Sequence, residues 1–169
     1  MARYDRKIKA MFKKVRTIAV KSARTHLRAV AEVVRDDLKK RIENQEFRSF
    51  REKPLTEKYR VYKAYHGLDD RVMIATGTYV DSIDVIQVNP DTFKIGFEPD
   101  MYAVRADGEV NQDLPLEVLA RIQEFGSITA NIPARPHWRP TFRRISDRSK
   151  RIAQNIGKLL VKDLRKALR

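Results

Sequence analysis

Residues from Asp5 to about Glu46 contain neither proline nor glycine, and apolar side chains recur along them at steps of three and four. This periodicity predicts one amphipathic helix. At 1.5 Å per residue the helix would be about 60 Å long, whereas a compact domain of this size is about 40 Å across. The helix must therefore bend or project. We expect a bend at Ser22, Thr25 and His26, where the apolar stripe is thinnest; without one, a neighbouring subunit must cover the excess length.

The segment after this helix is charged and contains Pro54, so residues 47–60 are predicted to be mainly a loop or linker. A short helix is expected from Thr56 to about Tyr65, with Gly67 ending it.

Alternating apolar residues then indicate strands. Residues 81–88 and 92–97 are separated by Asn89-Pro90-Asp91, and this arrangement predicts a β-hairpin. Residues 101–104 could add a third strand to the same small sheet. An exposed loop is expected at residues 106–111.

The last third of the chain returns to helical periodicity. Asp113 is expected to cap a helix that ends at Gly126. Three prolines between residues 132 and 140 favour an extended segment, and a second basic amphipathic helix is expected at residues 146–168. The pattern predicts an α+β fold, with a small antiparallel sheet packed by helices and long basic helices at both ends.

The composition fits a single folded domain of 169 residues. Hydrophobic residues make up 42% of the chain and charged residues 34%. No apolar run exceeds four residues, so neither a transmembrane helix nor a secretory signal is expected. Because the chain has no cysteine, it offers no thiol chemistry and no disulfides.

Positive charge is concentrated at the two ends of the chain. The net charge is +14, to which residues 1–30 contribute +9 and residues 134–169 contribute +10, whereas residues 31–133 carry −5. Basic ends around an acidic centre suit attraction to a polyanion, which could be a nucleic acid or an acidic protein surface. Solvated helix faces that only maintain solubility are the alternative.

Residues for catalysis or metal binding are sparse. His26, His66 and His137 lie far apart, and none has a second ligand three or four residues away. Pro90-Asp91 before a strand is typical of some metal-dependent nucleases, but Glu98-Pro99-Asp100 lacks the lysine that such a site needs. We therefore expect no catalytic, cofactor-binding or metal-binding residues.

Trp138 stands between Arg135 and Arg139 in the proline-rich segment. An aromatic residue flanked by bases can stack on a nucleobase. A lone tryptophan between prolines is more often an apolar anchor that holds an irregular segment on the core, and we favour that interpretation.

Several short motifs follow one another over about residues 54–145. They are Leu55-Thr56 to Lys63, Leu68 to Ala75, Thr76-Gly77-Thr78-Tyr79, Asp81-Ser82-Ile83, Ile95-Gly96, Ile122-Gln123-Glu124-Phe125-Gly126 and Ile132-Pro133-Ala134-Arg135-Pro136. Taken in this order, they resemble the tail-completion or virion morphogenesis family of long-tailed bacteriophages.

The resemblance implies a non-enzymatic α+β subunit that forms a ring at the head–tail junction of a virion after synthesis in the host cytoplasm. It implies contacts with other neck, connector and tail proteins, a hexamer or otherwise a dodecamer, passage of DNA through the ring, and no membrane. The chain departs from the family in its longer N-terminal helix (residues 1–46), in His137-Trp138, and in a longer loop at residues 106–114.

Basic residues near the two ends are the candidates for partner contact, and we expect the termini to dock on acidic surfaces of adjacent virion proteins. A nucleic-acid-binding protein that uses its basic helices is the main alternative, and a small hydrolase with an unrecognised site is a third. The candidate residues are Lys13, Lys14, Lys21, Arg135, Trp138, Arg139, Arg143 and Arg144.

Overall fold

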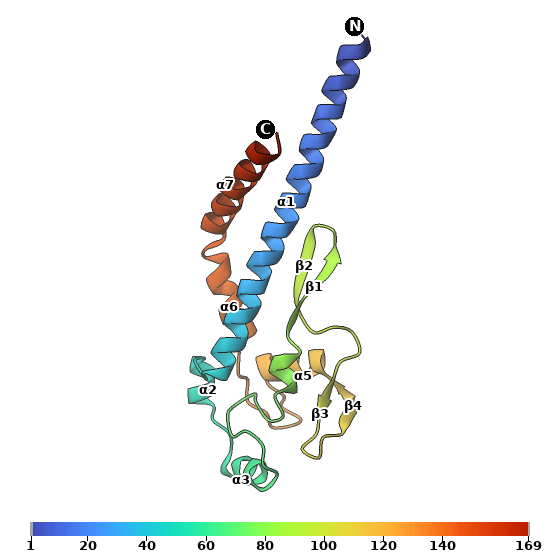
Figure 1. Ribbon diagram of the computed structural model, residues 1–169. Helices are drawn as coiled ribbons and strands as arrows, with labels where there is room; N and C mark the ends of the chain where they lie inside the picture. Colours follow the sequence, from blue (N-terminus) through green and yellow to red (C-terminus); the bar gives the residue numbers. More distant parts are fainter. Residues whose placement is uncertain (1, 169) are drawn as a thin grey trace.

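A computed structural model describes the backbone of residues 2–168 and the side chains of residues 9–168. The chain has the predicted α+β fold: helices pack with two small antiparallel sheets. One long helix runs out of the mixed α+β region and is accompanied for part of its length by the C-terminal helix (Figure 1). We call the mixed region, residues 32–148, the body.

Helix α1 (Ala2–Glu43) is continuous, so the bend expected near Ser22 is absent. Two of the polar residues in that stretch instead contact α7: Ser22 is buried, and both Ser22 and His26 contact Asp163. The helix ends three residues earlier than predicted, because Gln45 adopts a left-handed backbone with φ of 54°.

Two short helices follow. Helix α2 (Arg48–Glu52) lies in the segment predicted to be a loop, and it forms because Phe47 and Phe50 are both buried in the core. The predicted second helix is confirmed as α3 (Glu57–Tyr65). Its N-cap is Thr56, whose side chain accepts a hydrogen bond from the Tyr59 N–H at 3.4 Å.

The predicted hairpin is confirmed as β1 (Asp84–Asn89) and β2 (Thr92–Gly96), which pair antiparallel. A single-turn helix, α4 (Thr78–Asp81), precedes it and was not predicted. Gly77 occupies the position before α4 with φ of 84°, a conformation that glycine adopts without steric cost.

The predicted third strand is present as a strand, but it belongs to a second hairpin that also takes in part of the predicted loop. Strands β3 (Tyr102–Val104) and β4 (Val110–Pro115) pair with each other and not with the first sheet. The prediction that residues 106–111 are all loop is therefore wrong at Val110 and Asn111, and Asp113 lies in β4 rather than capping a helix.

The C-terminal part contains three helices. Helix α5 (Leu116–Phe125) ends at Gly126 as predicted, and α7 (Ser149–Ala167) is the predicted basic helix. Helix α6 (Trp138–Ser146) was missed, because Pro140 seemed to forbid it. Pro140 is the third residue of the helix, where a backbone N–H has no intrahelical partner and its absence costs little.

The hydrophobic core lies in the body, at the lower end of α1. There Leu38 and Ile42 pack against residues of α2, α4, β2 and α5. The buried members are Leu38, Ile42, Phe47, Phe50, Val72, Ile74, Tyr79, Val80, Ile83, Phe97 and Leu116.

Candidate functional site

The upper part of α1 (residues 9–31) and α7 form an antiparallel two-helix projection, which we call the stalk (Figure 1). Asp163 of α7 joins the two helices: its Oδ2 accepts a hydrogen bond from Ser22 Oγ at 2.6 Å and lies 3.0 Å from His26 Nε2. These two contacts, Ser22 first, hold the pKa of Asp163 below its usual value. Asp163 is therefore ionised where the helices meet.

The surface of the stalk is strongly basic. Within residues 9–31 and 149–167 there are thirteen lysines and arginines and one acid, Asp163. Lys13, Lys14 and Lys21, three of the predicted contact residues, are all exposed on α1.

Helix α1 extends past the end of α7. Asp163 lies level with Ser22 and His26, and α7 ends only four residues later, about 6 Å along the axis. The part of α1 before about Ile18 therefore has no α7 beside it (Figure 1). We call residues 9–17 the tip. Met11 and Phe12 in the tip are 54% and 64% exposed.

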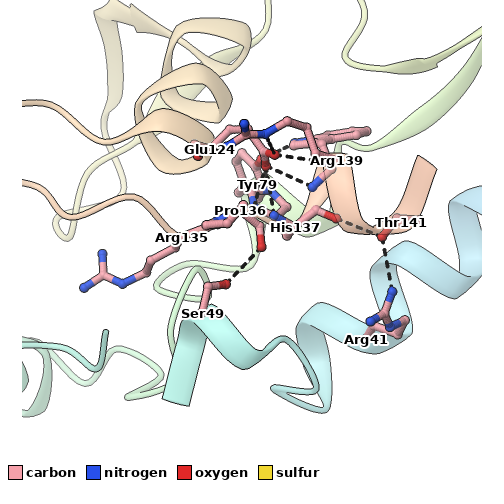
Figure 2. A network of polar contacts seen from close by, with 10 residues as sticks. Arg41, Ser49, Tyr79, Glu124, Arg135, Pro136, His137, Arg139 and Thr141 are labelled. Atoms are coloured by element: carbon pink, nitrogen blue, oxygen red, sulfur yellow. Dashed lines mark hydrogen bonds and ion pairs between the residues drawn. The ribbon is translucent and has the colours of Figure 1, made fainter. Parts of the chain in front are cut away.

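A buried polar network anchors the base of the stalk to the body (Figure 2). At its centre is Glu124 of α5, which is 4% exposed. Its carboxylate accepts hydrogen bonds from the backbone N–H groups of His137, Trp138 and Arg139 at 2.9–3.0 Å and from Arg139 Nε at 2.9 Å. Glu124 thus satisfies the free N–H groups at the start of α6.

The charge on Glu124 is stabilised by these donors. Burial opposes ionisation of the carboxyl group, but the backbone N–H groups and Arg139 outweigh that effect and lower its pKa. The pKa of His137 is also lowered, because its ring is fully buried. The network therefore holds an ionised glutamate beside a neutral histidine.

A chain of hydrogen bonds continues from His137. The Arg135 carbonyl oxygen lies 2.9 Å from Nδ1 and can only accept, which assigns the ring proton to Nδ1. Tyr79 Oη then donates to Nε2 at 2.8 Å and accepts from Trp138 Nε1 at 3.0 Å. Burial raises the pKa of Tyr79, so its phenol stays protonated.

Two side chains connect α2 and α1 to the same network. Ser49 Oγ donates to the Pro136 carbonyl at 2.9 Å, and Arg41 contacts Thr141 Oγ1 at 3.4 Å (Figure 2). Thr141 in turn donates to the His137 carbonyl at 2.8 Å. The network therefore fixes how α6, and with it α7, leaves the body.

The predicted contact residues separate into two groups. Lys13, Lys14, Lys21 and Arg143 are exposed. The other four take part in contacts within the chain. Arg139 does so with a side chain that is 62% exposed, whereas Arg135 is the most buried of the four at 6% exposure.

The contacts of this second group are specific. Arg135 donates to the carbonyls of Lys53 and Pro54, Arg139 pairs with Glu124, and Arg144 pairs with Asp37 at 2.5 Å. Trp138 packs against the core beside the Phe97 and Phe142 rings, as the anchor interpretation expects.

Sequence reasoning missed the roles of Glu124, His137 and Lys63. The signal for Glu124 was its place just before Gly126, in a motif already noted. Gly126 has φ of 80°, and a Cβ there would lie 2.9 Å from Ala134 N and Ile132 O, so the glycine allows residues 132–134 to return beside α5. The return brings residues 135–139 onto Glu124.

A groove of about 750 Å³ lies between α3 and the β3–β4 hairpin. Tyr59 and Tyr62 line it with stacked rings, and Lys63 lies at its wall. The Lys63 ammonium donates to three backbone carbonyls, those of Asp69, Arg71 and Ile74, at 2.5–2.9 Å. Lys63 therefore holds the 69–74 loop and has no donor left for a ligand.

The second hairpin carries the opposite charge from the stalk. Residues 98–113, which we call the acidic hairpin, contain five acids and one base, Arg105, and all six side chains are exposed. None of the five acids forms an ion pair with a described side chain. The acids are Glu98, Asp100, Asp107, Glu109 and Asp113.

Among the described side chains, no group of three histidines or acids is placed to hold a metal ion. None of the helices within residues 2–168 combines the length and the apolar content that crossing a bilayer requires. Comparison of the chain with protein-family models, with curated proteins and with solved structures gave no significant match.

Proposed function

We propose that this protein is a structural subunit of the phage neck or tail-terminus ring, which completes the tail and joins it to the head. The observation that carries the proposal is the stalk: a basic two-helix projection whose longer helix continues past its partner and exposes Met11 and Phe12. An isolated helix end gains little stability in water, so packing against another molecule would stabilise it.

The anchored base of the stalk supports the same role. A subunit that joins two assemblies must hold its contact element at a fixed angle. The Glu124–His137–Trp138 network does this, because it caps α6 and packs Trp138 on the core. The motif resemblance supplies the location in the virion, and the ring is proposed to be a hexamer, with a dodecamer as the alternative, through which DNA passes.

Loss of the gene in its phage tests the proposal. The mutant should accumulate filled heads and separate tails, and mass spectrometry should detect the protein in purified wild-type virions. Normal virions from the mutant, or absence of the protein from wild-type particles, would refute the virion role.

Nucleic-acid binding is the second candidate, favoured by the thirteen bases of the stalk. Neutralised phosphates would give tight binding that weakens steeply with added salt. A gel-shift titration at two salt concentrations distinguishes the candidates: the structural role expects only weak binding without sequence preference.

A further inference from the structure

We infer that the tip of one copy docks on the acidic hairpin of the next copy, so that the subunits join head to tail. The inference deepens the proposed function, on which it rests, by naming the two surfaces through which the ring would assemble.

The tip offers apolar surface surrounded by positive charge. Met11 and Phe12 are more than half exposed, and Lys9, Lys13 and Lys14 are exposed beside them. None of these lysines forms an ion pair with a described side chain. A partner must therefore bring both apolar surface and negative charge.

The acidic hairpin offers the complementary combination. Its five exposed acids have no described ion-pair partner, and two apolar side chains are exposed among them: Val110 at 56% and Met101 at 37%. Charge complementarity of this kind directs two surfaces together and rejects wrong pairings.

Distance within one molecule makes this contact intermolecular. The tip and the β3–β4 hairpin lie at opposite ends of the protein, so the acidic hairpin of one chain cannot contact the tip of the same chain (Figure 1). Each copy would give one tip and receive another. Such a heterologous contact closes into a ring when the rotation between copies allows it.

Other occupants fit less well. A tip-to-tip dimer would bring Lys9, Lys13 and Lys14 of two copies together, and like charges repel. DNA phosphates would pair with those lysines but would leave Met11 and Phe12 uncovered.

Charge reversal in the full-length chain tests the inference. The tip variant replaces exposed lysines, and the hairpin variant replaces acids whose side chains make no described hydrogen bond or ion pair, so both should fold. The tip variant is Lys9→Glu, Lys13→Glu and Lys14→Glu, and the hairpin variant is Glu98→Lys, Glu109→Lys and Asp113→Lys.

Light scattering in moderate salt should give an oligomer for the parent chain and a monomer for each variant alone. An equal mixture of the two variants should assemble again, because each then meets a surface of opposite charge. A chain that carries all six substitutions should also assemble. Circular dichroism checks that each variant is folded.

A control variant reverses three exposed acids outside the acidic hairpin and should assemble like the parent: Glu43→Lys, Asp70→Lys and Asp147→Lys. A monomeric parent at high concentration would refute this inference and ring formation together. Unchanged assembly of the tip variant would refute the inference alone. Unchanged assembly with loss of salt-sensitive DNA binding would assign the tip to nucleic acid instead.

Discussion

The stalk and the body of this protein are stabilised by different kinds of contact. The body contains a cluster of buried apolar residues and a buried carboxylate that accepts four hydrogen bonds. In the stalk, α7 has no fully buried residue, and the polar junction is Asp163 with Ser22 and His26. We therefore expect the body to unfold separately from the stalk, which depends on the body for its direction and would gain stability from a partner.

Replacement of Glu124 should have the largest effect on the body. Glu124→Ala leaves three N–H groups at the start of α6 without their acceptor and removes the partner of Arg139, so we expect a loss of about 3–5 kcal/mol in the free energy of unfolding. Urea denaturation measures the change. Arg121→Ala, an exposed residue of the same helix that makes no described ion pair, is the control and should change stability by about 0.5 kcal/mol or less. Equal stability of the two variants would contradict the anchoring role.

Truncation of Trp138 should be next in size. The ring packs against the core beside Phe97 and Phe142, and its Nε1–H donates to Tyr79, so Trp138→Ala should cost about 3 kcal/mol. Trp138 is the only tryptophan, so its fluorescence reports this environment directly. Emission typical of a solvated indole, with no loss of stability in the variant, would show that Trp138 is not an anchor.

Acid should weaken the body in two steps. Burial lowers the pKa of His137 in the folded state, so the unfolded state binds a proton first, and stability should fall as the pH drops below about 6.5. Glu124 also has a lowered pKa, so its contribution is present above about 4.3 and is lost as the pH falls further.

His137→Gln separates these steps, because glutamine can keep the polar contacts but does not titrate. The variant should lose the decline that begins near pH 6.5 and keep the one at lower pH. Thermal unfolding at a series of pH values measures both steps. If the loss of stability that begins near pH 6.5 is unchanged in the variant, it must come from a group other than His137.

Loss of the stalk junction should have the smallest effect and should stay local. Asp163→Ala removes the acceptor of Ser22 and His26, so amide exchange should become faster in α7 and in residues 9–26 of α1, while the urea midpoint of the body changes little. A large shift of that midpoint would mean that stalk and body unfold as one unit.

The sequence predicted those elements that carry strong periodicity and clear boundaries. The long helix, the first hairpin and the helix that ends at Gly126 all have both signals. Sequence reasoning failed where tertiary packing decides: β4 contains no alternating apolar pattern, and α6 forms because Glu124, a residue from another helix, supplies acceptors for its first turn.

The candidate contact residues show the same limit. The charges of Lys13 and Arg135 look equivalent in the sequence. In the structure, however, Arg135 is buried and donates to the carbonyls of Lys53 and Pro54, which the fold brings close although they are distant in the sequence. Such partners are set by the fold, so charge alone could not separate the stalk lysines from the arginines of the network.

Hydrogen–deuterium exchange at two protein concentrations tests the central claim, that the stalk is an assembly element on an independently stable body. On passing from the dilute to the assembled protein, amides in the tip (residues 9–17) and in the acidic hairpin (residues 98–113) should exchange more slowly, and those around Glu124 should not change. Stalk amides that exchange equally fast at both concentrations, while the measured mass shows an oligomer, would contradict the account.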